Sequence, residues 1–332
     1  MTTESRSEFH TDDNRPYYSY GAYCRFIFGR QMQKLPVSAG FTCPNRDGTK
    51  GTGGCSFCSN DAFTPSYCDA RQPIARQLDA AMAFYSRRIR PDTGFLAYFQ
   101  PFSNTYAPLE ELERRYAEAL AHPHIEGLVI ATRPDCVDER KLDFLAELAQ
   151  QTYICIEYGI ESTSDAVLRA VNRGHDFAAA RRAVEQTARR GITVGGHFIL
   201  GLPDEPDETL LDRVRTINSL PLTTVKFHQL QILDGTRMAA LYDDHPERFR
   251  HWSAETYIEL LAEMLRRLRP DIVVERIVNQ TPPRFRSRGS WSNLRSSDLW
   301  RMLEKRLLEK KAHQGDFLYL CNNVRPQTPE IH

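Results

Sequence analysis

The sequence contains no long hydrophobic run and no excess of charge of either sign. No stretch of its 332 residues approaches the roughly 18 consecutive apolar residues that typically cross a membrane. Lys and Arg together number 43, as do Asp and Glu, so the net charge points to no particular partner. The first 16 residues are polar without an apolar core, so no signal peptide is predicted, and the sequence has no evident internal repeat.

Cysteine is too sparse for a disulfide framework, with eight residues in a chain of this length. Without a signal peptide, these cysteines are expected to remain thiols in a reducing cytoplasm. The length suggests one large domain, or a domain with an extension, and a hydrophobic content of 41% is enough for a sizeable core.

Three of the cysteines, Cys43, Cys55 and Cys58, lie in one glycine-rich stretch, 40–60. Glycine accepts backbone angles that other residues avoid, so this stretch is predicted to be a loop that folds three thiolates together. Thiolates bind soft metals and iron–sulfur clusters. Closed structural sites normally have four ligands, so three leave a coordination position open for another molecule. The alternative is a zinc site closed by a fourth cysteine, for which Cys68 and Cys24 are the nearby candidates.

The spacing C-x11-C-x2-C, together with the motif CPNRDGTKG, resembles the cluster-binding loop of radical S-adenosylmethionine (radical SAM) enzymes. The long first gap is similar to that of the YhcC-like branch, which is related to the catalytic subunit of Elongator. The resemblance runs from about residue 18 to about residue 283. It implies that the three cysteines bind a [4Fe–4S] cluster whose fourth iron is chelated by the amine and carboxylate of SAM. It also implies that Phe57, directly before the last cysteine, lies near the adenine.

After this loop, short apolar stretches alternate with helical patterns. Strands are predicted at 34–41, 95–99, 127–131, 153–158, 192–200 and 224–232, and helices at 72–89, 108–121, 138–148, 164–171, 177–190 and 207–220. Asp138 is predicted to cap the helix at 138–148. Such alternation is typical of an α/β fold with a parallel sheet, and right-handed crossovers can curl that sheet into a barrel. The resemblance implies the partial (β/α)6 barrel of TIM type found in radical SAM enzymes, followed by a small α+β C-terminal extension.

The alternation stops near residue 235. Beyond it, helices are predicted at 238–242, 255–268 and 299–311, the last capped by Ser297 or Asp298, with a strand at 272–278. We therefore expect an N-terminal arm and lead-in over 1–32, the barrel over 33–235, the C-terminal extension over 236–313 and a tail over 314–332.

In barrels of this kind the chemistry lies at the C-terminal ends of the strands. Gln100, Ser103 and Asn104 follow the second predicted strand. The resemblance implies that this stretch holds the amino group of SAM, although the GGE-like motif of the superfamily is missing. Arg133 and Asp135 follow the third strand, where they either orient each other near the ribose or the substrate, or form a structural ion pair.

Three further residues are candidates for binding SAM through the same resemblance. Glu161, at the end of the fourth strand, can accept hydrogen bonds from the ribose hydroxyls. Arg173 matches the superfamily arginine that binds the SAM carboxylate, and a guanidinium suits a carboxylate because two parallel hydrogen bonds can form. His197, on the fifth strand, faces the adenine and ribose if the strand alternates inward from Gly195.

The sixth strand supplies the catalytic candidates on the substrate side. Lys226 and His228 fall on one face by period two, so both are predicted to point into the barrel. The opposite register would place Gln229 inside instead.

The resemblance implies a radical SAM enzyme. An electron delivered to the cluster, by a donor such as flavodoxin or ferredoxin, breaks the sulfonium C–S bond of SAM. The resulting 5′-deoxyadenosyl radical abstracts hydrogen from a substrate, while the protein positions the reactants and excludes solvent.

The substrate suggested by the Elongator relationship is the wobble uridine of tRNA. Two stretches that mix basic and aromatic residues, 17–32 and 283–291, could contact RNA, although packing and a solvated loop are the ordinary explanations. Elongator's acetyltransferase domain has no counterpart in this sequence, so acetyl-CoA-dependent carboxymethylation by this chain alone is not expected. The alternatives are a small-molecule or protein substrate, or a non-catalytic zinc-containing module that binds nucleic acid.

Overall fold

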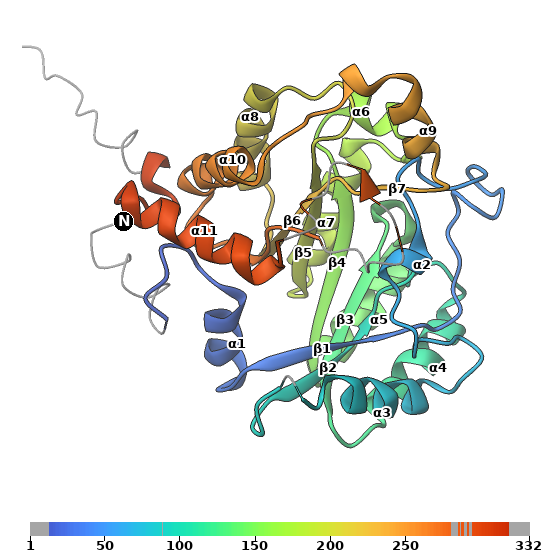
Figure 1. Ribbon diagram of the computed structural model, residues 1–332. Helices are drawn as coiled ribbons and strands as arrows, with labels where there is room; N and C mark the ends of the chain where they lie inside the picture. Colours follow the sequence, from blue (N-terminus) through green and yellow to red (C-terminus); the bar gives the residue numbers. More distant parts are fainter. Residues whose placement is uncertain are drawn as a thin grey trace, which may run out of the picture.

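A curled parallel sheet organises the chain (Figure 1). The computed structural model describes residues 13–87, 89–279, 285, 287–288, 291 and 294–318. Seven parallel strands pair in the order β1-β2-β3-β4-β5-β6-β8. Their bounds are Met32–Val37 (β1), Gly94–Phe99 (β2), Ile125–Thr132 (β3), Tyr153–Glu161 (β4), Thr193–Leu200 (β5), Thr224–Gln229 (β6) and Val273–Arg276 (β8). Ile232–Leu233 (β7) and Ser287–Arg288 (β9) form a separate antiparallel pair.

Helices connect successive strands and cover the outside of the sheet (Figure 1). The barrel helices are Ile74–Tyr85 (α3), Leu109–Leu120 (α4), Glu139–Ala149 (α5), Asp165–Ala170 (α6), Phe177–Arg189 (α7) and Asp207–Asn218 (α8). The remaining α-helices are Tyr20–Phe28 (α1), Asn60–Phe63 (α2), Arg237–Asp244 (α9), Ala254–Arg267 (α10) and Ser296–Glu309 (α11).

All six predicted barrel strands are present, but the sheet is one strand wider than predicted. The segment assigned to the C-terminal extension contains β8, which pairs in parallel with β6 through Thr224 and Val273. The helix α10 provides the crossover between them, so β8 continues the barrel sheet rather than forming a separate layer.

Two cap predictions had different outcomes. Asp138 caps α5 as predicted, because its side chain accepts a hydrogen bond of 3.0 Å from the amide of Lys141. The predicted cap of α11 is wrong, because the helix begins at Ser296 and Arg295 is the N-cap. Asp298 instead lies in the first turn and accepts from the Arg295 amide at 2.8 Å, which is the reciprocal half of a capping box.

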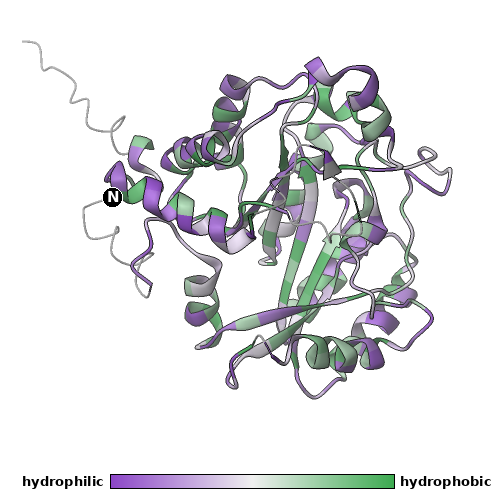
Figure 2. Cartoon of the chain, viewed as in Figure 1, coloured by the Kyte–Doolittle hydropathy of each residue, from purple (hydrophilic) through white to green (hydrophobic). Residues whose placement is uncertain are grey.

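The core lies between the sheet and its helices. Figure 2 shows hydrophobic residues along the strands and hydrophilic ones on much of the helices' outer surface. Val129, Ile130 and Ile156 are fully buried neighbours in adjoining strands, as expected for a parallel sheet that is covered on both faces. In the part of the chain that the structure describes, no helix is both long enough and apolar enough to span a bilayer.

The first and last strands of the sheet, β1 and β8, are not paired with each other, and we call the gap between them the seam. An ion pair bridges it, and the lead-in packs over it. Lys34 on β1 forms an ion pair of 2.6 Å with Glu275 on β8. Ser19, just before α1, bridges to Val274 on β8. The aromatic lead-in therefore packs against the seam, in agreement with the packing interpretation of residues 17–32.

Candidate active site

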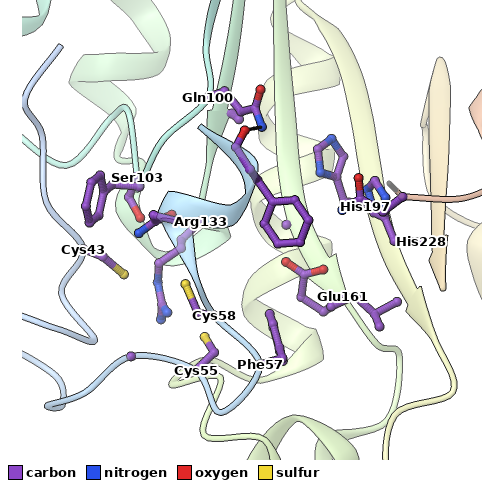
Figure 3. A pocket seen from close by; sticks show the side chains of 18 of the residues that line it. Cys43, Cys55, Phe57, Cys58, Gln100, Ser103, Arg133, Glu161, His197 and His228 are labelled. Atoms are coloured by element: carbon purple, nitrogen blue, oxygen red, sulfur yellow. Dashed lines mark hydrogen bonds between the residues drawn. The ribbon is translucent and has the colours of Figure 1, made fainter. Parts of the chain in front are cut away.

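The three loop cysteines line one cavity of about 250 Å³ at the C-terminal end of the sheet, which we call the cysteine cavity. Figure 3 shows Cys43, Cys55 and Cys58 on one side of it, with His197 and His228 on the opposite side. The loop is tied to distant elements by backbone hydrogen bonds, since the Ser56 amide donates to the Val171 carbonyl at 2.9 Å.

Cations and amides surround the thiols. Asn45 Nδ2 lies 3.7 Å from Cys55 Sγ, and Arg173 Nη1 lies 3.5 Å from the same sulfur. Arg46 Nη2 donates to the Cys58 carbonyl at 3.1 Å. Gly54 makes this approach possible, because its φ is +75° and a Cβ there would lie 3.0 Å from Arg46 Nε. Positive groups beside the sulfurs offset part of the negative charge that thiolate ligands bring to a bound cluster.

The donor set fits a cluster better than a single ion. Among the residues that the structure describes, no three Cys, His, Asp or Glu side chains converge on one point as a lone metal ion would require. The thiols stand around a cavity instead, which suits a larger iron–sulfur group held by several thiolates. Arg173 Nε is buried beside them and has no hydrogen-bond partner in the described part of the chain, so the wall still has a donor available for a ligand.

The four-cysteine zinc site finds no support in this arrangement. Cys68 does not line the cavity, and its thiol lies 3.1 Å from the Pro36 carbonyl, to which it donates. Burial raises the pKa of Cys68 to about 12, so it remains a neutral thiol. Cys24 is fully buried in a hydrophobic cluster with Met32 and Leu96, away from the cysteine cavity, and burial raises its pKa to about 11.

The residues after β2 separate into two groups. Gln100 and Ser103 line the cysteine cavity, and Gln100 Nε2 donates to the Phe63 carbonyl at 3.2 Å. Asn104 does not line it. Its amide donates to backbone carbonyls, including those of Phe99 at 3.0 Å and Ala131 at 2.9 Å, so Asn104 joins β2 to β3.

The end of β4 brings Glu161 and Arg173 together in the cavity wall. Glu161 has a φ of +68°, a conformation unusual for a residue with a side chain. Arg173 Nη2 lies 3.4 Å from Glu161 Oε1 and donates to the Gly159 carbonyl at 2.5 Å. A Cβ at Gly159 would lie 2.6 Å from that same nitrogen, so any side chain there would displace the guanidinium from this position.

Arg133 and Asp135 form a bidentate ion pair with both distances at 2.9 Å. Lys50 adds a third contact, 2.7 Å from Asp135 Oδ2. Arg133 lines the cavity and donates to the Arg173 carbonyl at 2.7 Å. The pair therefore orients the segment that presents Arg173.

A buried charge network, comprising Lys34, Glu157, Lys226, Glu275 and His197, lies in the barrel interior next to the cavity. Glu157, on β4, is its centre. Its carboxylate contacts the ammonium groups of Lys34 and Lys226, each at 2.6 Å, and accepts from His197 Nε2 at 2.9 Å. Gly195 makes room for it, since a Cβ there would lie 3.0 Å from Glu157 Cγ.

The protonation states follow from burial and these partners. Although burial opposes ionisation, Lys226 and Lys34 hold the pKa of Glu157 well below its usual value. Burial lowers the pKa of His197, and it also lowers that of His228 well below the usual value, with His197 adding to the effect. Both imidazoles are therefore neutral near pH 7. Their rings meet edge to face with centroids 5.2 Å apart, and His228 Nδ1 is buried with no hydrogen-bond partner among the residues that the structure describes.

Most of the predicted site residues meet at the cysteine cavity, namely Phe57, Gln100, Ser103, Glu161, Arg173, His197 and His228. Lys226 does not line it, because its ammonium is enclosed by Glu157 and Glu275. Gln229 lines the cavity together with His228, because β6 ends there and the alternation of faces ends with it.

Sequence reasoning missed Asn45, which contacts Cys55 Sγ, and Arg276, which lines the cavity. It also did not predict the buried ion pairs of Glu157. A charged residue inside the apolar run YICIEYGI was the available signal for Glu157, because a buried charge needs partners. Most of the basic stretch 283–291, and Cys321, lie outside the described residues.

Comparison with known proteins agrees with this geometry. Residues 43–217 match the family model of the radical SAM superfamily, and residues 222–309 match that of the radical SAM C-terminal domain. Protein YhcC of Escherichia coli is 35% identical over 251 residues, which cover 75% of this chain and 79% of YhcC. Human Elongator complex protein 3 is 27% identical over 238 residues, 69% of this chain and 41% of that protein.

Among solved structures, Elp3 of the archaeon Methanocaldococcus infernus has the same fold. The TM-score is 0.59 at 15% identity, and the match covers 85% of this chain and 64% of the Elp3 chain. The chain therefore belongs to the radical SAM superfamily, in the YhcC-like branch related to Elongator complex protein 3, and it is an enzyme whose cofactors are a [4Fe–4S] cluster and SAM.

Proposed function

We propose that this enzyme binds SAM in the cysteine cavity and abstracts hydrogen from a substrate that reaches the side of the cavity formed by His197 and His228. The observation that carries this proposal is the meeting of three cysteines with Arg173 and Glu161 around one cavity. When bound, the cluster supplies an electron for reductive cleavage of SAM, which yields the 5′-deoxyadenosyl radical.

The chain's own residues bind and orient. Cys43, Cys55 and Cys58 hold the cluster, and Arg173 offers its guanidinium to the SAM carboxylate next to Cys55. Glu161 accepts from the ribose hydroxyls, and Phe57 packs near the adenine. Arg133, fixed by Asp135, keeps the Arg173 segment in place through the Arg173 carbonyl.

On the substrate side, His228 lines the cavity with a ring that is neutral near pH 7. Lys226 acts indirectly. Its ion pair with Glu157 stabilises the carboxylate that accepts from His197, so Lys226 is a positioning residue in this scheme.

The substrate we propose is the wobble uridine of tRNA. Support comes from the similarity of this chain to Elongator complex protein 3. The family resemblance noted in the sequence implies this substrate. A small-molecule or protein substrate is the alternative. We further propose a flavodoxin or a ferredoxin as the electron donor, because the cluster needs a low-potential reductant.

The test of the chemistry is anaerobic purification, reconstitution with iron and sulfide, and assay of 5′-deoxyadenosine after addition of SAM and a strong reductant. We expect product from the wild type and from Cys68→Ser, and none from Cys55→Ala. A protein that carries zinc but forms no iron cluster and no product would refute the proposal.

The test of the substrate is binding of tRNA as a function of salt. Contacts to phosphates release counterions, so the affinity should fall steeply as salt rises. If no tRNA binds at low salt, the tRNA proposal is wrong, while the cleavage assay decides the chemistry independently.

A further inference from the structure

A second cavity, of about 780 Å³, opens at the seam between β1 and β8, and we call it the seam cavity. It is large enough for a nucleotide, since ligand pockets typically measure about 300–1,000 Å³. The two cavities share wall residues, which are Phe63, Tyr98, Gln100, Arg276 and Asn279. A molecule in the seam cavity therefore lies directly against the site where hydrogen is abstracted.

Aromatic rings form much of the wall of the seam cavity. Phe63 and Tyr98 lie at the boundary with the cysteine cavity, and Phe84 and Tyr85 of α3 lie farther out. Phe84 is 52% exposed even though its ring contacts Tyr85 with a centroid distance of 5.0 Å. Flat ligands stack on such rings, and nucleic-acid bases do so regardless of sequence.

The polar groups among these rings can read a heterocycle. Gln100 and Asn279 carry side-chain amides, each of which both donates and accepts hydrogen bonds. Gln100 makes one hydrogen bond among the described residues, from Nε2 to the Phe63 carbonyl, and its amide oxygen stays available for a ligand. Amides among aromatic rings are a common means of recognising the polar edge of a base.

Arg276 is the cation at the seam cavity whose charge the nearby buried carboxylates do not pair with in the described part of the chain. Lys34 and Lys226 are matched by Glu157 and Glu275, so that the interior group is neutral. Arg276 faces both cavities, and within the described part of the chain its one hydrogen bond is a long contact of 3.5 Å to Asn279 Oδ1. Arg276 has no carboxylate partner among the described residues, and such an arginine in a ligand-sized cavity suits a phosphate.

We propose that the seam cavity binds a nucleoside phosphate, with its base among the aromatic rings and its phosphate on Arg276, so that the nucleoside faces the cysteine cavity past Gln100. The phosphate belongs either to RNA or to a free nucleotide. The RNA source rests on the tRNA substrate proposed above, whereas binding of a free nucleotide does not.

The experiment measures binding of two probes, uridine 5′-monophosphate by calorimetry and unmodified tRNA transcripts by fluorescence anisotropy, to the reconstituted protein. We expect Arg276→Gln to weaken both about tenfold and to lower the salt slope for tRNA by about one. Phe84→Ala should weaken both by about tenfold through lost stacking. Arg276→Lys should retain much of the affinity, because the ammonium still binds phosphate as a point charge.

Matched controls are Arg189→Gln on α7 and Leu308→Ala on α11, whose side chains are exposed and line neither cavity. Both should bind like the wild type. Phe84 is half exposed, so its truncation should leave the fold intact and keep the test valid even if Arg276→Gln lowers stability.

The outcomes separate the two proposals. If the wild type binds both probes and the variants bind both more weakly, the result supports the seam cavity as the binding site and RNA as the source of the phosphate. Binding of the mononucleotide alone, lost in the variants, supports the cavity and refutes the tRNA substrate. Variants that bind both probes as tightly as the wild type refute the cavity and leave the tRNA proposal standing, whereas a wild type that binds neither probe refutes both.

Discussion

Replacement of Glu157 by glutamine tests the buried charge network most directly. The carboxylate contacts Lys34 and Lys226 at 2.6 Å and His197 at 2.9 Å, and it is fully buried. Glutamine keeps the shape and one acceptor but removes the charge. Two buried ammonium groups would then share one carboxylate, that of Glu275.

The expected cost is about 3–5 kcal/mol of unfolding free energy, the range for breaking a buried ion pair from one side. Urea unfolding under anaerobic conditions, followed by circular dichroism, measures it. The double variant Glu157→Gln with Lys226→Met removes one charge of each sign, so it should recover at least about 1 kcal/mol relative to Glu157→Gln alone. The control Glu111→Gln breaks ion pairs on the surface of α4 and should cost about 0–1 kcal/mol.

The same comparison has a defined pH dependence. The folded pKa of Glu157 is held well below its usual value, so the stability it contributes is fully present above the unfolded pKa of about 4.3 and is lost as pH falls below it. The difference between wild type and Glu157→Gln should therefore be constant from about pH 8 to 5 and shrink below that. A Glu157→Gln cost under about 1 kcal/mol, or a double variant no more stable than the single one, would show that the network does not balance charge as described.

Three further substitutions test other parts of the site. Gly195→Ala places a Cβ 2.8 Å from Thr224 Oγ1 and 3.0 Å from Glu157 Cγ, so we expect a loss of about 1–3 kcal/mol in urea unfolding, whereas Gly21→Ala in α1, with its nearest neighbour at 3.5 Å, should be neutral or stabilising. Because Glu161 has a φ of +68°, the free energy of unfolding of Glu161→Gly should be about 1 kcal/mol higher than that of Glu161→Gln. Equal free energies of unfolding would refute backbone strain. Asp135→Asn removes the charge of the carboxylate that pairs with Arg133 and Lys50, the two cations that hold the pKa of Asp135 well below its usual range despite burial. SAM binding by calorimetry should therefore weaken severalfold, and unchanged affinity would show that Arg133 does not position Arg173.

The sequence was sufficient to predict the barrel strands and the cysteine loop, because both are encoded locally. Apolar runs such as LVIA and YICI mark buried strands, and the cysteines lie within 16 residues of one another. The cap of α11 was predicted wrongly because Asp298 can serve either as the cap or as the residue that reaches back to it, and the sequence does not distinguish these positions.

Contacts between distant strands could not be predicted. Period two placed Lys226 and His228 on one face correctly, but Lys226 is enclosed by carboxylates from β4 and β8, whose positions depend on the register of the whole sheet. Asn104 has the residue type of a ligand-binding group, yet neighbouring carbonyls engage its amide, and only the loop geometry reveals this. Arg276 was missed because β8 was assigned to an extension rather than to the barrel.

The ion pair across the seam has a consequence for synthesis of the chain. Lys34 and Glu275 are 241 residues apart, so the lysine leaves the ribosome long before its partner is made. Until then, Glu157 alone must offset two ammonium groups in the forming interior, which favours keeping that interior open to water. Completion of the barrel is thus linked to translation of β8, its last strand. The interior of the nascent enzyme remains accessible to water while its cysteine loop is already outside the ribosome.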